Sequence, residues 1–331
     1  MTAEHLMADT SLSTVDSADG TLGVSNSEIQ TFKQCRRKWY IQYYLKYRPR
    51  KTEIVSARAL GTRVHAALEH YYRDGIPLLA THSKLLEEDR LTLESQGMDP
   101  ADLDNDGDLG HVMLEGYEQW VAEEGLDANL EIISVEEMMS LPVETAYGTV
   151  NLVGKLDLRV RNLATGARRV LDFKTAQAFS NFTAISHIAE QLPTYTILDR
   201  ATHEASGDTD YVEGGIYRIL RKVKRGPRAN PPFYGEFEIR HNEFHLRSVW
   251  TRITGIISDM MRTRKALDEG ANHLFVVYPT PDRSCSWKCE AYSICPLFDD
   301  GSDFRGMLEE DFERSDPYAY YGSKPEEEHD V

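Results

Sequence analysis

Three charged side chains in two neighbouring segments have the types and the spacing for metal chemistry. Asp172 and Lys174 form a D-x-K pair, and Asp157 lies upstream in the sequence G-K-L-D. Side chains at positions i and i+2 of a strand share one face, so Asp172 and Lys174 are expected to point the same way. The residues between the two segments, 161–169, include an asparagine and a glycine that favour a turn. We therefore expect an antiparallel hairpin that brings Asp157 beside Asp172.

The chemistry of this trio depends on whether its strands are buried. Charged residues on a hairpin are most often a solvated surface, and an isolated D-x-K pattern carries little weight. Here the intervening residues of both strands are apolar, among them Leu156, Leu158, Leu171 and Phe173. Unpaired charge is costly to bury, so a charged cluster on such strands indicates a function. Two carboxylates and an ammonium group suit a divalent cation and the hydrolysis of a phosphodiester.

The four cysteines of the chain form a second candidate site. Cys285, Cys289 and Cys295 lie in one short segment that ends in Cys-Pro, and Cys35 lies about 250 residues earlier. In a cytosolic protein such clustering points to a metal rather than to disulfides. The one-plus-three arrangement favours a [4Fe–4S] cluster, and tetrahedral zinc or unrelated buried thiols are the alternatives. A bound cluster would join the N-terminal and C-terminal segments of the chain.

The net charge of −17 is distributed unevenly. Residues 1–24 carry four acidic residues and no Lys or Arg, whereas residues 299–331 carry twelve acidic and three basic residues. These two tails account for −4 and −9, so the body of the chain carries only −4. Residues 33–51 hold eight basic residues and residues 218–228 hold six, with no acid in either run. Basic runs are more often ordinary surface, but these two are candidate strips for a nucleic-acid backbone. The candidate contacts are Arg36, Arg37, Lys38, Arg221, Lys222 and Lys224.

Length and composition indicate a globular protein. With 331 residues, 41% of them hydrophobic, the chain is long enough for one large or two modest domains with a real core. No segment approaches the roughly 20 apolar residues of a membrane span, and the N-terminus lacks a signal-peptide pattern. We expect a soluble, cytoplasmic protein without a membrane partner, whose polar acidic tails are disordered.

The periodicity of apolar residues predicts helices around a strand-rich centre. Helices are expected over 29–47, 61–75, most of 76–130 with an interruption at 98–108, 186–200 and 244–268; strands are expected as three runs within 131–174 and at 211–221 and 233–240. This order divides the chain into five regions. They are an acidic tail (1–24), a helical region with the first cysteine (25–130), a strand-rich core (131–240), a helix with the cysteine segment (241–298) and a second acidic tail (299–331).

Taken together, the motifs of this chain resemble those of the PD-(D/E)XK nuclease superfamily. Within it, the resemblance is to the RecB-like branch with an iron–sulfur cluster, which includes CRISPR-associated four-cysteine exonucleases and phage relatives. It covers residues 25–298 and rests on motifs in the same order along the chain. These are Cys35 in a basic aromatic helix, G-x-x-x-H ending at His65, G-x-x-D ending at Asp157, D-x-K from Asp172 to Lys174, Q-x-x-x-Y from Gln191 to Tyr195, and the cysteine triplet. The proline of the superfamily's name is absent before Asp157, and Pro193 falls inside Q-x-x-x-Y.

The resemblance implies a role for each matching residue. His65, Asp157, Asp172 and the backbone carbonyl of Phe173 would hold Mg²⁺ or Mn²⁺. Lys174 would position or activate the attacking water, while Gln191 and Tyr195 would orient the site and contact DNA. The four cysteines would hold the [4Fe–4S] cluster.

The resemblance also implies a fold and an activity. The fold would be α/β (α+β), with a restriction-endonuclease-like core in which helices flank a central mixed sheet, a helical N-terminal region and a C-terminal iron–sulfur segment. The activity would be metal-dependent exonuclease action on single-stranded DNA ends, in recombination, repair or CRISPR-type processing. The alternative is a catalytically inert iron–sulfur subunit that binds DNA or serves in assembly. DNA is the expected partner, with a helicase or an integrase as a further candidate, in the host cytoplasm if the protein is phage-encoded.

Overall fold

The structure is a computed structural model that describes residues 22–50, 54–206 and 212–319. The chain forms two compact units. The first, here called the sheet unit, comprises residues 53–139 and 155–249; the second, the cysteine unit, comprises residues 1–52, 140–154 and 250–331. The expected boundaries at 130/131 and 240/241 separate regions by composition, and they remain a prediction.

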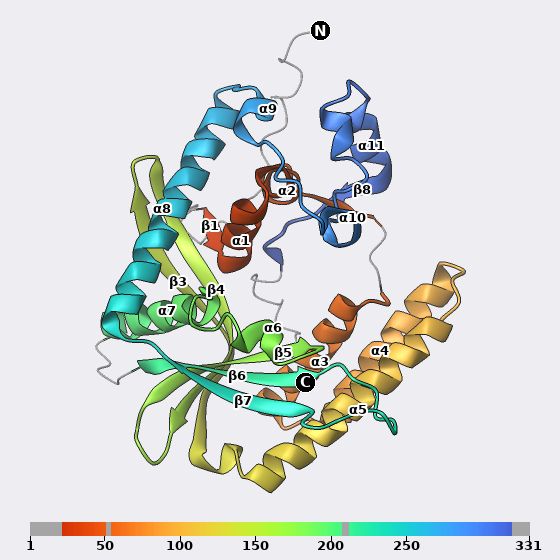
Figure 1. Cartoon of the computed structure of the whole chain (residues 1–331), viewed down its shortest axis with the longest axis vertical. Helices are drawn as coiled ribbons and strands as arrows, with labels where there is room; N and C mark the ends of the chain where they lie inside the picture. The colour runs from red at the N-terminus through yellow and green to blue at the C-terminus, as the bar shows by residue number, and fades with distance from the viewer. Residues whose placement is uncertain (1–21, 51–53, 207–211, 320–331) are drawn as a thin grey trace, which may run out of the picture. The chain divides into compact units, whose positions relative to one another are not determined.

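The sheet unit is built on a mixed sheet whose strands belong to the predicted strand-rich region (Figure 1). Its strands are β3 (Leu130–Thr145), β4 (Gly148–Asn162), β5 (Arg168–Ala176), β6 (Val212–Arg221) and β7 (Tyr234–Arg240), of which β3 and β4 continue into the cysteine unit. β3 pairs with β4, β4 pairs antiparallel with β5, β5 parallel with β6, and β6 antiparallel with β7. Each strand predicted from the sequence is therefore present.

The β4–β5 hairpin has the turn that its sequence predicts. The side-chain oxygen of Asn162 accepts from the N–H groups of Ala164 and Thr165, each at 3.0 Å. Gly166 has a φ of 72°, in the left-handed region that glycine adopts at little cost. Leu158 consequently lies opposite Leu171, which fixes the register of the two strands. The predicted antiparallel pairing is confirmed.

Helices flank this sheet. The helices of the sheet unit are α3 (Ala57–Asp74), α4 (Leu78–Ser95), α5 (Ala101–Glu124), α6 (Ser180–Thr183), α7 (Gln191–Ser206) and the first residues, 243–249, of α8 (Glu243–Asp268), the rest of which belongs to the cysteine unit. α3 begins after Ser56, whose hydroxyl accepts from the N–H of Ala59, and it ends at Gly75 with a φ of 69°. The expected fold class, a central mixed sheet with helices on it, is confirmed. None of the helices among the described residues is long and apolar enough to cross a membrane.

The main core of the sheet unit lies between the sheet and helices α3 and α5. Phe173 of β5 is 2% exposed, and its ring stacks on that of Tyr72 and meets the edge of Tyr117. Leu171, two positions earlier, is buried in the same cluster. Because neighbours in a strand alternate in direction, Asp172 points to the opposite face. Burial of the apolar face of β5 thus determines where the acid lies.

The cysteine unit contains the first and last segments of the chain. Its elements are β1 (Gly23–Ser25), α1 (Asn26–Gln34), α2 (Arg36–Trp39), a π-helical turn (Tyr40–Tyr44), β2 (Tyr47–Pro49), α9 (His273–Val276), α10 (Cys285–Lys288), a 3₁₀ turn (Pro296–Phe298), α11 (Phe304–Asp311) and β8 (Phe312–Arg314). β1 pairs in parallel with β4, where Gly23 lies opposite Asn151. β2 and β8 pair antiparallel.

Four expectations about secondary structure are wrong. The helical interruption expected over 98–108 is shorter, because α5 already begins at Ala101. The helix predicted over 29–47 is divided at Cys35, which has an extended backbone with φ −160°. The helix predicted from residue 186 begins at Gln191 instead, and residues 184–188 before it form turns. The second tail was expected to be disordered, yet residues 304–314 form α11 and β8, and β8 is held by its pairing with β2. Residues 1–21 and 320–331 of the two tails lie outside the described residues.

Candidate active site

Asp157 lies where the pairing of β4 with β5 ends. The register between β4 and β5 runs as far as Leu158 and Leu171. One residue further on, the carboxylate of Asp157 accepts a hydrogen bond from the backbone N–H of Phe173 at 2.8 Å. The Asp157 side chain thus supplies the acceptor for a buried backbone N–H of β5 at the point where the pairing with β4 has ended. This bond fixes Asp157 next to the D-x-K segment, as the sequence predicts.

Asp172 and Lys174 are in direct contact. Asp172 Oδ2 lies 2.5 Å from Lys174 Nζ, and the aspartate is 2% exposed. Gln191 of α7 donates from Nε2 to Asp172 Oδ1 and to the hydroxyl of Tyr195, each at 3.3 Å. Pro193 lies in the first turn of α7, where a missing N–H costs no helical hydrogen bond. The proline inside Q-x-x-x-Y therefore leaves Gln191 and Tyr195 on one side of the helix.

His65 reaches the same place from α3. Its Nδ1 lies 3.5 Å from Asp157 Oδ2, and its ring meets that of Phe173 edge-on at 6.4 Å. Burial lowers the pKa of His65, and the nearby Lys174 lowers it further. A neutral imidazole has a free lone pair and is the form that binds metals. The structure brings His65 together with the two aspartates, and its role as a ligand remains a prediction.

Both aspartates hold protons more tightly than an exposed carboxyl group. Burial raises the pKa of Asp157 to about 7, against the opposing effect of Lys174 and with a further rise from Glu136. Burial likewise raises the pKa of Asp172 to about 6, where Lys174 opposes the rise and the charge of Asp157 adds to it. The single ammonium group of Lys174 does not compensate for the burial of the two carboxylates. Added positive charge at this place would therefore be favourable.

Glu136 is an acid of this site that the sequence analysis did not single out. Its side chain is buried, and Oε2 lies 2.7 Å from Lys155 Nζ. Its charge raises the pKa of both Asp157 and His65. Glu136 also has a φ of 53°, which is unfavourable for a residue other than glycine and occurs most often at functional sites. Nothing in its sequence neighbourhood, a strand with two successive glutamates, predicts either property.

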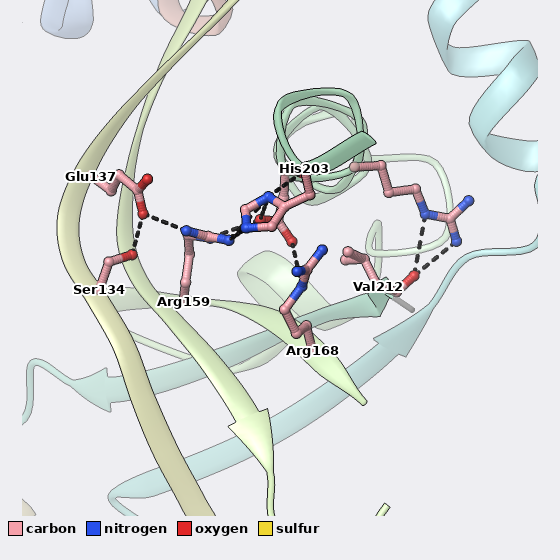
Figure 2. A network of polar contacts seen from close by, with 8 residues as sticks. Ser134, Glu137, Arg159, Arg168, His203 and Val212 are labelled. Atoms are coloured by element: carbon pink, nitrogen blue, oxygen red, sulfur yellow. Dashed lines mark hydrogen bonds and ion pairs between the residues drawn. The ribbon is translucent and has the colours of Figure 1, made fainter. Parts of the chain in front are cut away.

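Helix α7 carries a row of polar side chains that starts at the site and ends in a buried ionic network. Gln191, Tyr195, Asp199 and His203 follow at intervals of four residues, so they share one side of the helix. At the far end of the row, Asp199 accepts from Arg159 Nε at 2.7 Å, and Arg159 also donates to Glu137 and contacts His203 (Figure 2). Asp199 is 1% exposed. This network attaches α7 to β4 and so holds Gln191 over Asp172.

The four cysteines line one pocket of about 160 Å³ in the cysteine unit. All four thiols are free, and two of them accept hydrogen bonds from the backbone, Cys35 from the N–H of Thr280 and Cys285 from that of Asp282, each at 3.4 Å. Burial raises the pKa of Cys289 and of Cys295, and Arg37 opposes the rise at Cys295. The break at Cys35 turns this thiol toward the C-terminal segment. The structure thus gathers residues that are far apart in the sequence.

Within the described residues, no group of three or more His, Cys, Asp or Glu side chains is placed to hold a metal ion. The donors nevertheless fit the two expected groups. Asp157 and Asp172 are hard oxygen donors in a place with excess negative charge, as Mg²⁺ and Mn²⁺ require. The cysteine pocket offers four thiols with N–H groups directed at sulfur, an arrangement that tunes iron–sulfur clusters.

The expected nucleic-acid contacts differ in how accessible they are. Arg37 is 2% exposed and bonds to both carboxylate oxygens of Asp299, at 2.6 and 2.9 Å, which argues against its predicted role in binding DNA. Arg36 pairs with Asp259 at 3.0 Å, and Lys38 lines the cysteine pocket. Lys224 is exposed, whereas Arg221 and Lys222 are half-buried. Arg221 and Lys222 donate to backbone carbonyls, and Lys224 donates to the side chain of Asn105. Arg218 of the same basic run is fully buried.

Comparison with known proteins identifies the class to which this fold and site belong. A profile of the PD-(D/E)XK nuclease superfamily matches residues 23–296. The match covers most of the chain, and the chain belongs to this superfamily. Its mixed sheet flanked by helices is consistent with the restriction-endonuclease-like fold.

Two individual proteins are similar to the chain. A protein of Moorella thermoacetica that is named as a subunit of an ATP-dependent helicase/deoxyribonuclease is 24% identical over 283 residues, which cover 75% of this chain and 23% of that protein. The chain thus spans less than a quarter of that relative's length. The crystal structure of SSO0001 covers 88% of this chain and 91% of its own, with 15% identity and a TM-score of 0.37.

Proposed function

We propose that this chain is a divalent-cation-dependent deoxyribonuclease that removes nucleotides from single-stranded DNA ends. Membership of the nuclease superfamily supports phosphodiester hydrolysis. The relative named as a helicase/deoxyribonuclease subunit supports DNA as the substrate and suggests a helicase partner. The observation that carries the proposal is the gathering of two desolvated, electrostatically coupled aspartates around one lysine. The preference for single strands and for ends comes from the sequence resemblance.

The residues of the site would divide the work. Asp157 and Asp172, with His65 and the Phe173 carbonyl, would hold Mg²⁺ or Mn²⁺. Such an ion, when bound, polarises a phosphate oxygen and makes a water molecule more acidic. Lys174 places a fixed positive charge where the phosphate gains negative charge during the reaction. Gln191 holds the Asp172 carboxylate in place, and the Phe173 N–H does the same for Asp157.

The cysteine pocket is proposed to hold a [4Fe–4S] cluster with a structural role. It would join α2, which follows Cys35, to the segment from Cys285 to Cys295. Closing a loop of this length by metal ligation stabilises a fold mainly by restricting the unfolded chain. The cluster would therefore support the nuclease without taking part in hydrolysis.

A cleavage assay on end-labelled DNA tests the nuclease proposal. Oligonucleotides labelled at the 5′ or the 3′ end are incubated with the protein and Mg²⁺ or Mn²⁺, with EDTA as the metal-free control. We expect metal-dependent release of nucleotides, and loss of at least a hundredfold in rate for Asp172→Asn and Lys174→Ala. Asp108→Asn, an exposed aspartate of the sheet unit, is the matched control and should cleave normally. Undiminished cleavage by folded Lys174→Ala would refute the assignment, and absence of cleavage by the unmutated protein would favour the inert subunit.

A further inference from the structure

The segment between β5 and α7 exposes apolar side chains directly beside the candidate active site. Ile185 is 49% exposed and Ile188 is 63% exposed, although both belong to the sheet unit and lie within a few residues of Gln191. Isolated exposed apolar residues need no explanation, but a contiguous group beside a charged site does. The segment begins with α6, which Figure 1 shows next to the end of β5.

Backbone hydrogen bonds align three of these side chains. The N–H of Ile185 donates to the carbonyl of Phe182, and the N–H of Ile188 donates to that of Ile185 at 2.9 Å. Both are bonds across three residues, as in a 3₁₀ turn, in which side chains at i and i+3 lie above one another. Phe182, Ile185 and Ile188 therefore form a row on one side of the segment, here called the apolar ledge.

The apolar ledge starts at the lysine of the D-x-K pair. The ring of Phe182 lies 6.0 Å from Lys174 Nζ, and the ring of Tyr217 lies 5.9 Å from the same atom. The two rings are themselves 5.9 Å apart. The ammonium group of Lys174, which is proposed to bind a phosphate, thus lies at one end of the apolar ledge, and the ledge extends from there toward solvent. A nucleotide is complementary to this arrangement, because it combines an anionic phosphate with a base that has apolar faces.

We propose that the apolar ledge binds the unpaired base next to the phosphate at Lys174. The inference rests on the proposed function and deepens it, because it names the part of the substrate that sets strand preference. In a single strand the base is free to lie on the ledge, whereas in a duplex it is stacked and paired and must first be unstacked at a cost. The ledge therefore favours single-stranded DNA at the site itself, independently of the basic surface residues.

Abasic substitution combined with mutation of the ledge tests this proposal. Single-stranded oligonucleotides carrying an abasic residue at one position at a time are cleaved by the unmutated protein and by Ile185→Ser/Ile188→Ser. Because base contacts of this kind contribute substantially to binding, an abasic residue at the ledge position should lower kcat/KM of the unmutated protein by roughly tenfold. The ledge variant should lose about the same factor on the intact strand and lose little more on the abasic one. Leu91→Ser, which changes an exposed leucine of α4, is the matched control.

Two further readouts separate the possible failures. In the Asp172→Asn background, where cleavage is expected to stop, a 2-aminopurine base at the same position should fluoresce more strongly when bound to the intact ledge than to the serine variant, because it leaves its stack on the neighbouring bases to lie on aliphatic side chains. If the strand is cleaved but the losses from the abasic residue and the mutation simply multiply, the ledge proposal is wrong and the nuclease proposal stands. If no strand is cleaved in any metal, the nuclease proposal itself has failed. Unchanged cleavage by the ledge variant would also overturn the ledge proposal.

Discussion

Replacement of Asp157 by asparagine should stabilise the metal-free protein at alkaline pH while abolishing its metal response. In the folded protein the pKa of Asp157 is raised to about 7, mainly by burial, whereas an unfolded chain titrates near 3.9. A raised carboxyl pKa means that the folded state binds more protons than the unfolded state between these two values, so stability falls as pH rises through this window. Each pKa unit corresponds to about 1.4 kcal/mol, so the ionised carboxylate costs the fold on the order of 4 kcal/mol above pH 7.

Asparagine removes this cost and keeps the structure. Its side-chain oxygen can still accept from the Phe173 N–H, which Asp157 does at 2.8 Å. Loss of the charge should also lower the pKa of Asp172, because the charge of Asp157 contributes to its rise. We therefore expect Asp157→Asn to unfold in urea with a free energy about 2–4 kcal/mol higher than the unmutated protein near pH 8, and about equal to it near pH 4.

The measurement is urea unfolding followed by circular dichroism in EDTA at several pH values, with Asp108→Asn as the exposed control. Addition of Mg²⁺ near pH 8 should then stabilise the unmutated protein and leave Asp157→Asn unchanged, because only the former presents two carboxylates. A stability difference that is the same at both ends of the pH range would refute the reasoning, since it would show that ionisation of Asp157 costs the fold nothing. Destabilisation by asparagine near pH 8 would do the same.

Three further predictions concern the supports of the site. Asp199→Ala removes the more deeply buried of the carboxylates that pair with Arg159 and should lower the free energy of unfolding by about 3–5 kcal/mol, as measured in urea. Anaerobically purified protein should contain about four irons per chain, and Cys289→Ser should lower both the iron content and the melting temperature; stoichiometric zinc would contradict the cluster. Lys222→Ala/Lys224→Ala should weaken DNA binding and reduce the dependence of log Kd on log salt by about one for each lost phosphate contact. A salt dependence equal to that of the unmutated protein would remove these two lysines from the DNA surface.

Much of the site follows from local patterns in the sequence. The alternation in strands predicts that Asp172 and Lys174 share a face, and the turn at Asn162 and Gly166 predicts the register that brings Asp157 near them. The spacing of four between Gln191 and Tyr195 predicts their contact. These features depend on backbone geometry within a few residues, which is why a single sequence carries them.

Features that depend on distant contacts were missed or misjudged. The break at Cys35 lies in a run that reads as one continuous helix, and residues 304–314 are ordered through pairing of β8 with β2, which the acidic composition conceals. Arg37 looks like a surface cation in sequence but is buried against Asp299, about 260 residues away. A charged side chain can be buried when a partner of opposite charge lies beside it. When that partner is so distant in the sequence, the residues around Arg37 do not reveal it.

The face of the sheet opposite Asp172 has its own part in positioning the metal donors. Phe173 donates its N–H to Asp157, so the position of its backbone sets that of the carboxylate. Its ring stacks on Tyr72, whose hydroxyl contacts Arg218 at 3.0 Å, and Arg218 lies opposite Phe173 on β6. Because Arg218 is fully buried, its partners Asp127 and Glu236 must hold it in one place. A buried cation on the apolar side is therefore linked through two aromatic residues, Tyr72 and Phe173, to the site where the phosphate is proposed to bind.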